Sequence, residues 1–207
     1  MLNEIRNYLD FAGLQYRNPD KAGEEREKML ELRHKGQEAR KAFTELAKAF
    51  QASHPEWQLQ QTSQWMNQAQ RLRPHFWAYL QREGKVTEPM MALRLYGSSS
   101  DFGVSLEVSF IERKKDEQTL GKQAKVLEIP TVEGIYYLAY SDGQSQRWEA
   151  NEENRKILRN KISNQEVRKV LVKIDVPITE NSSEEEIVEA LLKSYDKILP
   201  FYLATRN

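Results

Sequence analysis

The chain has 207 residues, enough for one domain or for a domain with a helical appendage. Its 31 basic and 31 acidic side chains give a net charge of zero, which argues against a generic polyanion-binding protein. The absence of cysteine excludes disulfides, thiol nucleophiles and zinc–thiolate sites. No signal-peptide pattern and no run of roughly 20 apolar residues appears, so we expect a cytoplasmic protein without a membrane partner.

Two helices are predicted at the start of the chain. Residues 3–12 have a short amphipathic pattern. The second helix is predicted to begin at Asn18, which can cap it, with Pro19 at its first position. It runs to about residue 53 and, at ~1.5 Å per residue, would be roughly 50 Å long.

One narrow apolar stripe follows this long helix. Its members recur at alternating spacings of three and four: Met29, Leu32, Gly36, Ala39, Phe43, Leu46 and Phe50. The stripe suits packing on the chain's own sheet. It also suits a homodimer through the 19–53 helix, in which Gly36 would let a partner helix approach closely.

The rest of the chain mixes strand and helix patterns. We predict helices at 62–71, 116–128, 152–161 and 184–199, and strands at 75–80, 91–97, 102–111, 134–140 and 167–176, with 146–149 pairing back on 134–140. Ser183 and Glu186 form a capping box for the last helix, which Pro200 is expected to end.

Because helices come first and hairpin-connected strands follow, the fold class is α+β. We expect an antiparallel or mixed sheet of about five to six strands packed by helices, with a long N-terminal helix. Residues 1–207 are expected to form a single domain with a helical part at 1–56 and a sheet-containing core at 74–203.

The strands at 91–97 and 102–111 alternate so regularly that they determine their own register. Leu95 must share a face with Val104, which requires opposed residue numbers to sum to about 199. This register places Arg94 opposite Ser105 and diagonal to Glu107 on the other, polar face of the hairpin.

The polar face is the candidate binding surface. The candidate ligand-binding residues are Arg94, Tyr96, Ser105 and Glu107, together with His75, Trp77 and Tyr79 from the 75–80 strand. If the N-terminal helices cover this face only in part, Arg94 and Glu107 form the floor of a groove, beside a flexible polar loop at 96–103. The alternative is a surface ion pair worth ~0–1 kcal/mol.

No motif for catalysis or for a metal is specific enough to assign. Asp101 and residues 112–114 imitate the Asp…Glu-x-Lys pattern of metal-dependent nucleases. At the two ends of one strand, however, the carboxylates would lie roughly 35 Å apart, too far to share a metal ion. Gly121 and Lys122 lack the flanking residues of a phosphate loop. We therefore predict no catalytic residue, no metal and no cofactor.

A basic block lies late in the chain. It comprises Arg155, Lys156, Arg159, Lys161, Arg168, Lys169 and Lys173, with Glu166 as its one acid. It could be a solvated face offset by the acidic stretch at 175–189. It could also be a basic edge, joined by residues 113–115, that contacts phosphates while Trp77, Tyr79 or Trp148 stacks on a base.

Three segments, residues 73–80, 107–112 and 193–203, resemble a family of small uncharacterised proteins of the YktB type from Gram-positive bacteria. The resemblance implies a single α+β domain with a Pro-His-Phe strand and a C-terminal helix ending in Leu-Pro-x-Tyr. A looser likeness, through the layout and residues 134–138, is to the N-terminal recognition domains of McrB-type restriction systems, which bind modified DNA by taking a base into an aromatic pocket. Neither resemblance implies an activity for this chain.

Together these observations favour a binding or interaction module whose partner is nucleic acid or another protein, with nucleic acid as the first hypothesis. One alternative is a small enzyme that uses Arg94 and Glu107, with His75 as acid or base. The other is an oligomerisation protein built on the long helix.

Overall fold

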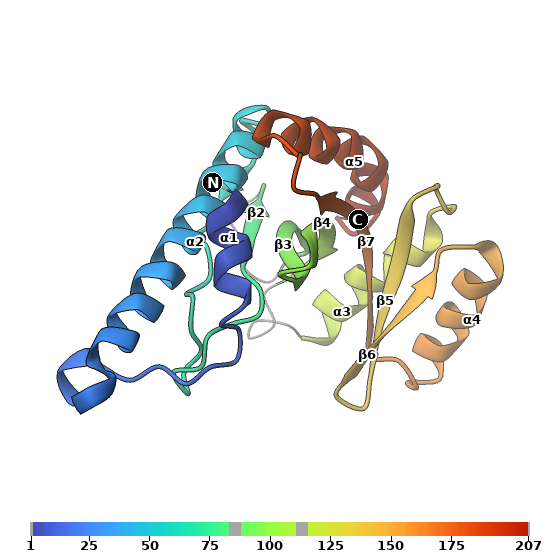
Figure 1. Ribbon diagram of the computed structural model, residues 1–207. Helices are drawn as coiled ribbons and strands as arrows, with labels where there is room; N and C mark the ends of the chain where they lie inside the picture. The colour runs from blue at the N-terminus through green and yellow to red at the C-terminus, as the bar shows by residue number, and fades with distance from the viewer. Residues whose placement is uncertain (1, 83–87, 111–115, 207) are drawn as a thin grey trace.

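The computed structural model describes residues 2–82, 88–110 and 116–206 (Figure 1). Within these ranges the α+β class is confirmed, with five α-helices and a seven-stranded sheet. The helices are α1 (Leu2–Leu9), α2 (Arg26–Ala52), α3 (Glu117–Ala124), α4 (Glu152–Ser163) and α5 (Glu184–Ala204), with short 3₁₀ helices η1 (Pro19–Lys21), η2 (Gly23–Glu25) and η4 (Lys125–Glu128). The strands are β1 (Gln58–Leu59), β2 (Trp77–Gln81), β3 (Met90–Ser98), β4 (Asp101–Ser109), β5 (Ile135–Ser141), β6 (Gln144–Glu149) and β7 (Lys169–Ile178).

The sheet is antiparallel throughout and has the order β1-β2-β3-β4-β7-β5-β6. The expected count of five to six strands missed β1, which has only two residues. β7 enters the sheet between two hairpins, β3–β4 and β5–β6, and therefore has hydrogen-bonded neighbours on both sides. This insertion places residues from distant parts of the chain side by side.

The predicted hairpin register is confirmed. Leu95 pairs with Val104, and Arg94 pairs with Ser105. The apolar face of the sheet packs in one hydrophobic core with α1, α2, α4 and α5, and in Figure 1 α1 lies alongside α2, with α4 on the opposite side of the molecule. Among the described residues, every buried apolar side chain of a helix belongs to this core.

The polar face of the sheet is separate from that core. Its buried apolar side chains, which come from strands or from the residue directly after one, are Met90, Ala92, Phe110, Tyr136 and Leu171, and none belongs to the main core. α1 and α2 bury their apolar sides in the main core, on the other face of the sheet. The polar face is available to position a site.

The helix expected at 62–71 does not form. This segment is irregular, with a turn at residues 67–70 that is closed by an isolated antiparallel bridge between Met66 and Leu72. Tertiary contacts outweigh its helical pattern, because the Tyr8 hydroxyl lies 2.5 Å from the carbonyl of Trp65 and Arg40 donates to the carbonyl of Thr62.

The start of α2 and the end of α5 also differ from expectation. α2 begins at Arg26 and not at residue 19, because two 3₁₀ turns precede it and Gly23 has a φ of +56°. α5 begins with the predicted capping box but continues past Pro200 to Ala204. Phe201 and Tyr202 are buried, so packing keeps the last turn helical beyond the proline.

The 96–103 loop is much shorter than expected. β3 continues to Ser98 and β4 begins at Asp101, so that only two residues form the turn. Gly97 makes this continuation feasible, because its φ is +89° and a Cβ there would lie 2.0 Å from the Asp101 carbonyl oxygen. The hairpin tip is a tight turn and not a long polar loop.

The apolar stripe of α2 packs within the chain. All seven of its members are buried against α1, the 60–76 segment or the rest of the core. At Gly36 the close neighbour is Trp65 of the same chain, since a Cβ there would lie 2.5 Å from its indole ring. A homodimer through α2 would therefore need other residues than this stripe. No helix in the described ranges has the length and apolar character needed to cross a membrane.

Two helical glycines provide a test of this packing. Gly36→Ala gains helix propensity but forces Cβ into the Trp65 ring, and we expect it to lower the free energy of unfolding by about 1–3 kcal/mol. Gly121→Ala in α3 is the matched control, because a Cβ there meets no heavy atom within 4 Å, and it should raise stability by up to ~1 kcal/mol. Urea unfolding of both variants measures the difference. A stabilised Gly36→Ala variant would show that Trp65 does not pack there.

Candidate functional site

The polar face has a buried carboxylate at its centre. Glu107 of β4 is 0% exposed, and its Oε1 accepts hydrogen bonds from Arg94 Nε at 3.1 Å and Nη2 at 3.0 Å. The Lys173 Nζ lies 2.9 Å from Oε2 as an ion pair, although Oε2 receives no hydrogen bond of good geometry. These three residues form the Arg94–Glu107–Lys173 triad.

The strand register explains the triad. Glu107 pairs directly with Lys173 across β4 and β7, and Arg94 on β3 is diagonal to Glu107. Burial alone would raise the pKa of Glu107, but the positive charges of Arg94 and Lys173 outweigh it and lower the pKa to about 2. Burial would lower the pKa of Arg94, but the charge of Glu107 raises it above its ordinary value. The triad is therefore ionised at neutral pH and carries one net positive charge.

Cations lie over the aromatic rings of this face. The guanidinium Cζ atoms of Arg73 and Arg94 lie 4.7 and 5.4 Å from the ring centroid of Trp77. On the other side of the triad, Lys169 Nζ lies 4.0 Å from the ring centroid of Tyr140. Such contacts fix the orientation of both partners.

A second polar cluster lies beside the triad on β5, β6 and β7. Asp175 accepts hydrogen bonds from the Tyr136 hydroxyl at 2.9 Å and from Arg147 Nη1 at 2.8 Å. The Arg147 Cζ lies 3.5 Å from the centroid of the Tyr136 ring, and the Arg147 side chain is 61% exposed. Arg147 therefore presents a stacked guanidinium to solvent.

The face has a local excess of positive charge. Burial, followed by the charges of Arg94, Arg73 and Lys173, lowers the pKa of His75 to about 4, so this imidazole is neutral at pH 7. Burial also lowers the pKa of Lys169, to about 8; the charge of Glu107 opposes this fall, and the charge of Arg94 adds to it. A chain that is neutral overall thus carries a positive region on one face of its sheet.

The structure brings most of the predicted candidates together. Arg94 and Glu107 contact each other, and Trp77 and Tyr79 lie on the same face on the neighbouring strand. Ser105 is buried, and its hydroxyl donates to the Arg94 carbonyl. Tyr96 is part of the face at its Gly103 end, where its hydroxyl lies close to the Gly103 backbone. His75 precedes β2 and lies with its ring 5.8 Å from that of Trp77.

Several members of the site were missed. Tyr136 and Tyr140 occur four residues apart on a strand, which puts both on one side of β5, and this spacing was the available signal. Arg147 and Asp175 come together only through the pairing of β5 with β6 and β7. No local pattern indicates that contact.

The groove expected over Arg94 and Glu107 stays a prediction. Two hollows in the described part of the chain lie elsewhere, one of about 540 Å³ between the end of β7 and α5 and one of about 410 Å³ between α1 and α2. Neither Arg94 nor Glu107 lines these two hollows. In the described ranges, no cluster of three or more histidine, aspartate or glutamate side chains is placed to hold a metal.

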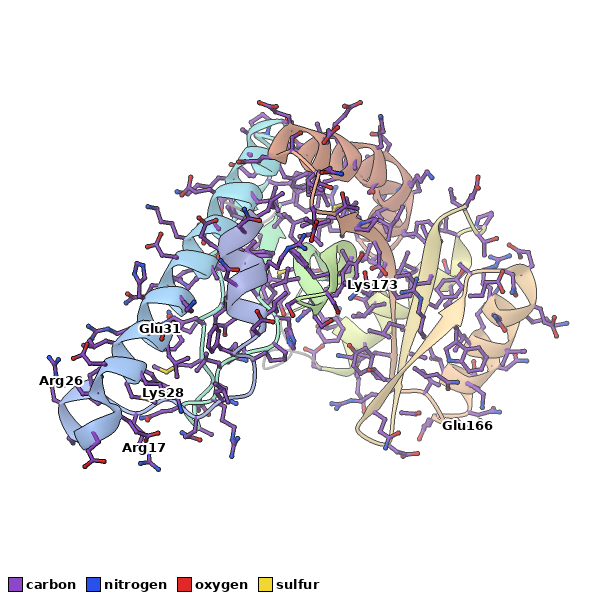
Figure 2. The ribbon with its side chains drawn as sticks, in the orientation of Figure 1. Arg17, Arg26, Lys28, Glu31, Glu166 and Lys173 are labelled. Atoms are coloured by element: carbon purple, nitrogen blue, oxygen red, sulfur yellow. The ribbon has the colours of Figure 1, made fainter. Side chains whose placement is uncertain are left out.

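The basic block does not form one surface. Arg155 pairs with Glu152, and Lys161 pairs with Glu166. Lys169 and Lys173 are instead buried on the polar face. The exposed remainder of the block is Lys156, Arg159 and Arg168. Figure 2 shows the separation, with Lys173 near the middle of the molecule and Glu166 beside α4. Residues 113–115 and Glu112 lie outside the described residues.

Comparisons with protein-family models, with curated proteins and with solved structures each found no match. The resemblances to the YktB-type and McrB-type families therefore stay predictions.

Glu107→Gln tests the energetics of the triad. The change leaves Arg94 and the buried Lys173 without a negative partner, and we expect the free energy of unfolding to fall by about 3–5 kcal/mol. Glu149→Gln on the exposed edge strand β6 is the matched control and should change stability by less than about 0.5 kcal/mol. Denaturant unfolding of the two variants gives the comparison, and equal effects would show that the triad is not a buried charge network.

His75 should make folding sensitive to mild acid. Its folded pKa is depressed to about 4 from 6.5, so its contribution to stability is present above pH 6.5 and is lost as the pH falls towards 4. Glu107 acts in the same direction at lower pH, between about 4.5 and 2. Thermal unfolding of His75→Gln and wild-type chains between pH 7 and 4 should show a smaller loss of stability in the variant. Parallel curves would contradict the assignment.

Proposed function

We propose that this protein binds single-stranded nucleic acid on the polar face of its sheet. The observation that carries the proposal is the set of cations held over aromatic rings on the polar face, which receives none of the fully buried apolar side chains of the described helices: Arg73 and Arg94 on Trp77, Lys169 on Tyr140, and Arg147 on Tyr136. Positive charge attracts phosphates, and exposed planar groups stack on bases.

Single strands fit this arrangement better than a duplex. A planar guanidinium that lies on an aromatic ring offers its second side to a base, as Arg147 does on Tyr136. In a duplex the flat sides of the bases are already stacked on one another, so they cannot reach these groups. Only the phosphates of a duplex would then contribute.

The charges favour binding over acid–base catalysis. A general acid or base works best when its pKa lies near the working pH. Glu107 has a pKa of about 2 and is completely buried between two cations, and His75 has a pKa of about 4. At pH 7 Glu107 is therefore ionised and His75 is neutral. Fixed charge states of this kind suit the positioning of cations for a ligand.

The oligomerisation alternative receives less support. The apolar stripe of α2, which suggested a dimer seam, packs inside the chain, with Gly36 against Trp65. The charged groups that remain at the free end of α2, such as Arg26 and Glu31 in Figure 2, lie far from the polar face.

Fluorescence anisotropy with a labelled oligothymidylate of twelve nucleotides tests the proposal. At ~50 mM salt we expect binding that is tighter for the single strand than for a duplex of equal length and that weakens as salt is raised. Trp77→Leu removes one stacking ring and should weaken binding about tenfold. Absence of binding to single-stranded DNA and RNA at this salt concentration would overturn the proposal.

Arg159→Gln tests whether the nucleic acid binds the polar face of the sheet or the basic surface of α4. Arg159 is exposed on α4, whose apolar side packs on the core side of the sheet, so this variant should bind like the wild type. If Arg159→Gln weakens binding and Trp77→Leu does not, the nucleic acid binds α4 and the assigned face is wrong.

A further inference from the structure

The way Glu107 holds Arg94 leaves one edge of the guanidinium group available. Nε and Nη2, which share one edge, both donate to Oε1 of Glu107. Nη1 donates to neither oxygen of Glu107, the Tyr79 hydroxyl lies within hydrogen-bonding reach of the Arg94 side chain, and that side chain is 24% exposed. The outer edge, formed by Nη1 and the second N–H of Nη2, is not used by Glu107 and carries two parallel donors.

The guanidinium is fixed from several sides. Glu107 is completely buried and is itself held by Lys173, so the carboxylate cannot swing away. Trp77 lies beside the guanidinium, with its ring centroid 5.4 Å from Cζ. A donor pair that is already oriented loses little conformational entropy when a ligand binds.

The surroundings of Arg94 favour an anion. Burial raises the pKa of Tyr79 and of Tyr140; the charge of Glu107 adds to this rise, and the charge of Arg94 opposes it at both, together with a hydrogen bond from Arg94 at Tyr79. The depressed pKa of His75 has Arg94, Arg73 and Lys173 among its causes and shows that positive charge prevails over Glu107 here. Two parallel N–H groups in a positive region match the oxygens of a phosphate.

We infer that the outer edge of Arg94 binds one backbone phosphate of the single strand in a two-pronged contact, and that Glu107 is the positioning residue that orients it. This inference rests on the proposed function and adds the group that is recognised and the residue that recognises it. A guanine edge offers the same pair of acceptors, but it is neutral, and a strand of thymidines lacks it.

Arg94→Lys is the decisive variant, because lysine keeps the charge and loses the fork. With the oligothymidylate of twelve nucleotides we expect affinity to fall about tenfold. The slope of log affinity against log salt concentration should stay the same, since the number of cations is unchanged. Arg159→Lys on α4 makes the same chemical change away from the face and should leave both affinity and slope at wild-type values.

The outcomes separate the inference from the proposed function. If the wild-type chain does not bind the oligonucleotide, both are overturned. If it binds and Arg94→Lys binds equally well, the proposed function stands and the phosphate contact is overturned.

A measurement on the unsubstituted protein covers the case in which Arg94→Lys does not fold. The guanidinium NMR signals of Arg94 should shift on addition of the oligothymidylate, and its Nη protons should exchange more slowly with water. Unchanged Arg94 signals in a chain saturated with oligonucleotide would overturn the inference.

Discussion

A carboxylate that is completely removed from water constrains this molecule more than any other group. Glu107 can stay ionised at the centre of the sheet only because Arg94 and Lys173 both reach it. These cations come from β3 and β7, the strands on either side of β4. The strand order therefore has an electrostatic requirement as well as a hydrophobic one, since any arrangement that separates β7 from β4 leaves a buried charge uncompensated.

The two faces of the sheet have different roles. One face packs the helices and supplies most of the burial that stabilises the chain. The other buries a small set of strand side chains together with Glu107, Lys169 and Lys173, while the Arg147 side chain reaches solvent. Because Glu107 fixes Arg94 and Asp175 fixes Arg147, the cations on this face have defined orientations, which a set of mobile surface lysines would lack.

The local sequence pattern predicted those structural features that depend on residues close to one another in the chain. The alternation around Leu95 and Val104 was sufficient for the register and for the Arg94–Glu107 contact. The partnership with Lys173 could not be predicted, because it depends on where a strand more than sixty residues later joins the sheet. The helix expected at 62–71 was wrong for a related reason, since Trp65 is held by Gly36 and by the Tyr8 hydroxyl. Tyr136 lies in the strand predicted at 134–140, but only the pairing of β5 with β6 and β7 brings it to Arg147 and Asp175.

The insertion of β7 between two hairpins has a kinetic consequence. The β3–β4 and β5–β6 hairpins consist of contacts between residues close in the chain, whereas β7 must close long loops to reach either one. Until it arrives, Glu107 has Arg94 alone as its cation, and the tyrosines of β5 lie on a separate hairpin. The complete polar face thus requires β7 to be paired on both sides, so a chain in which β7 has not yet joined the sheet would lack it.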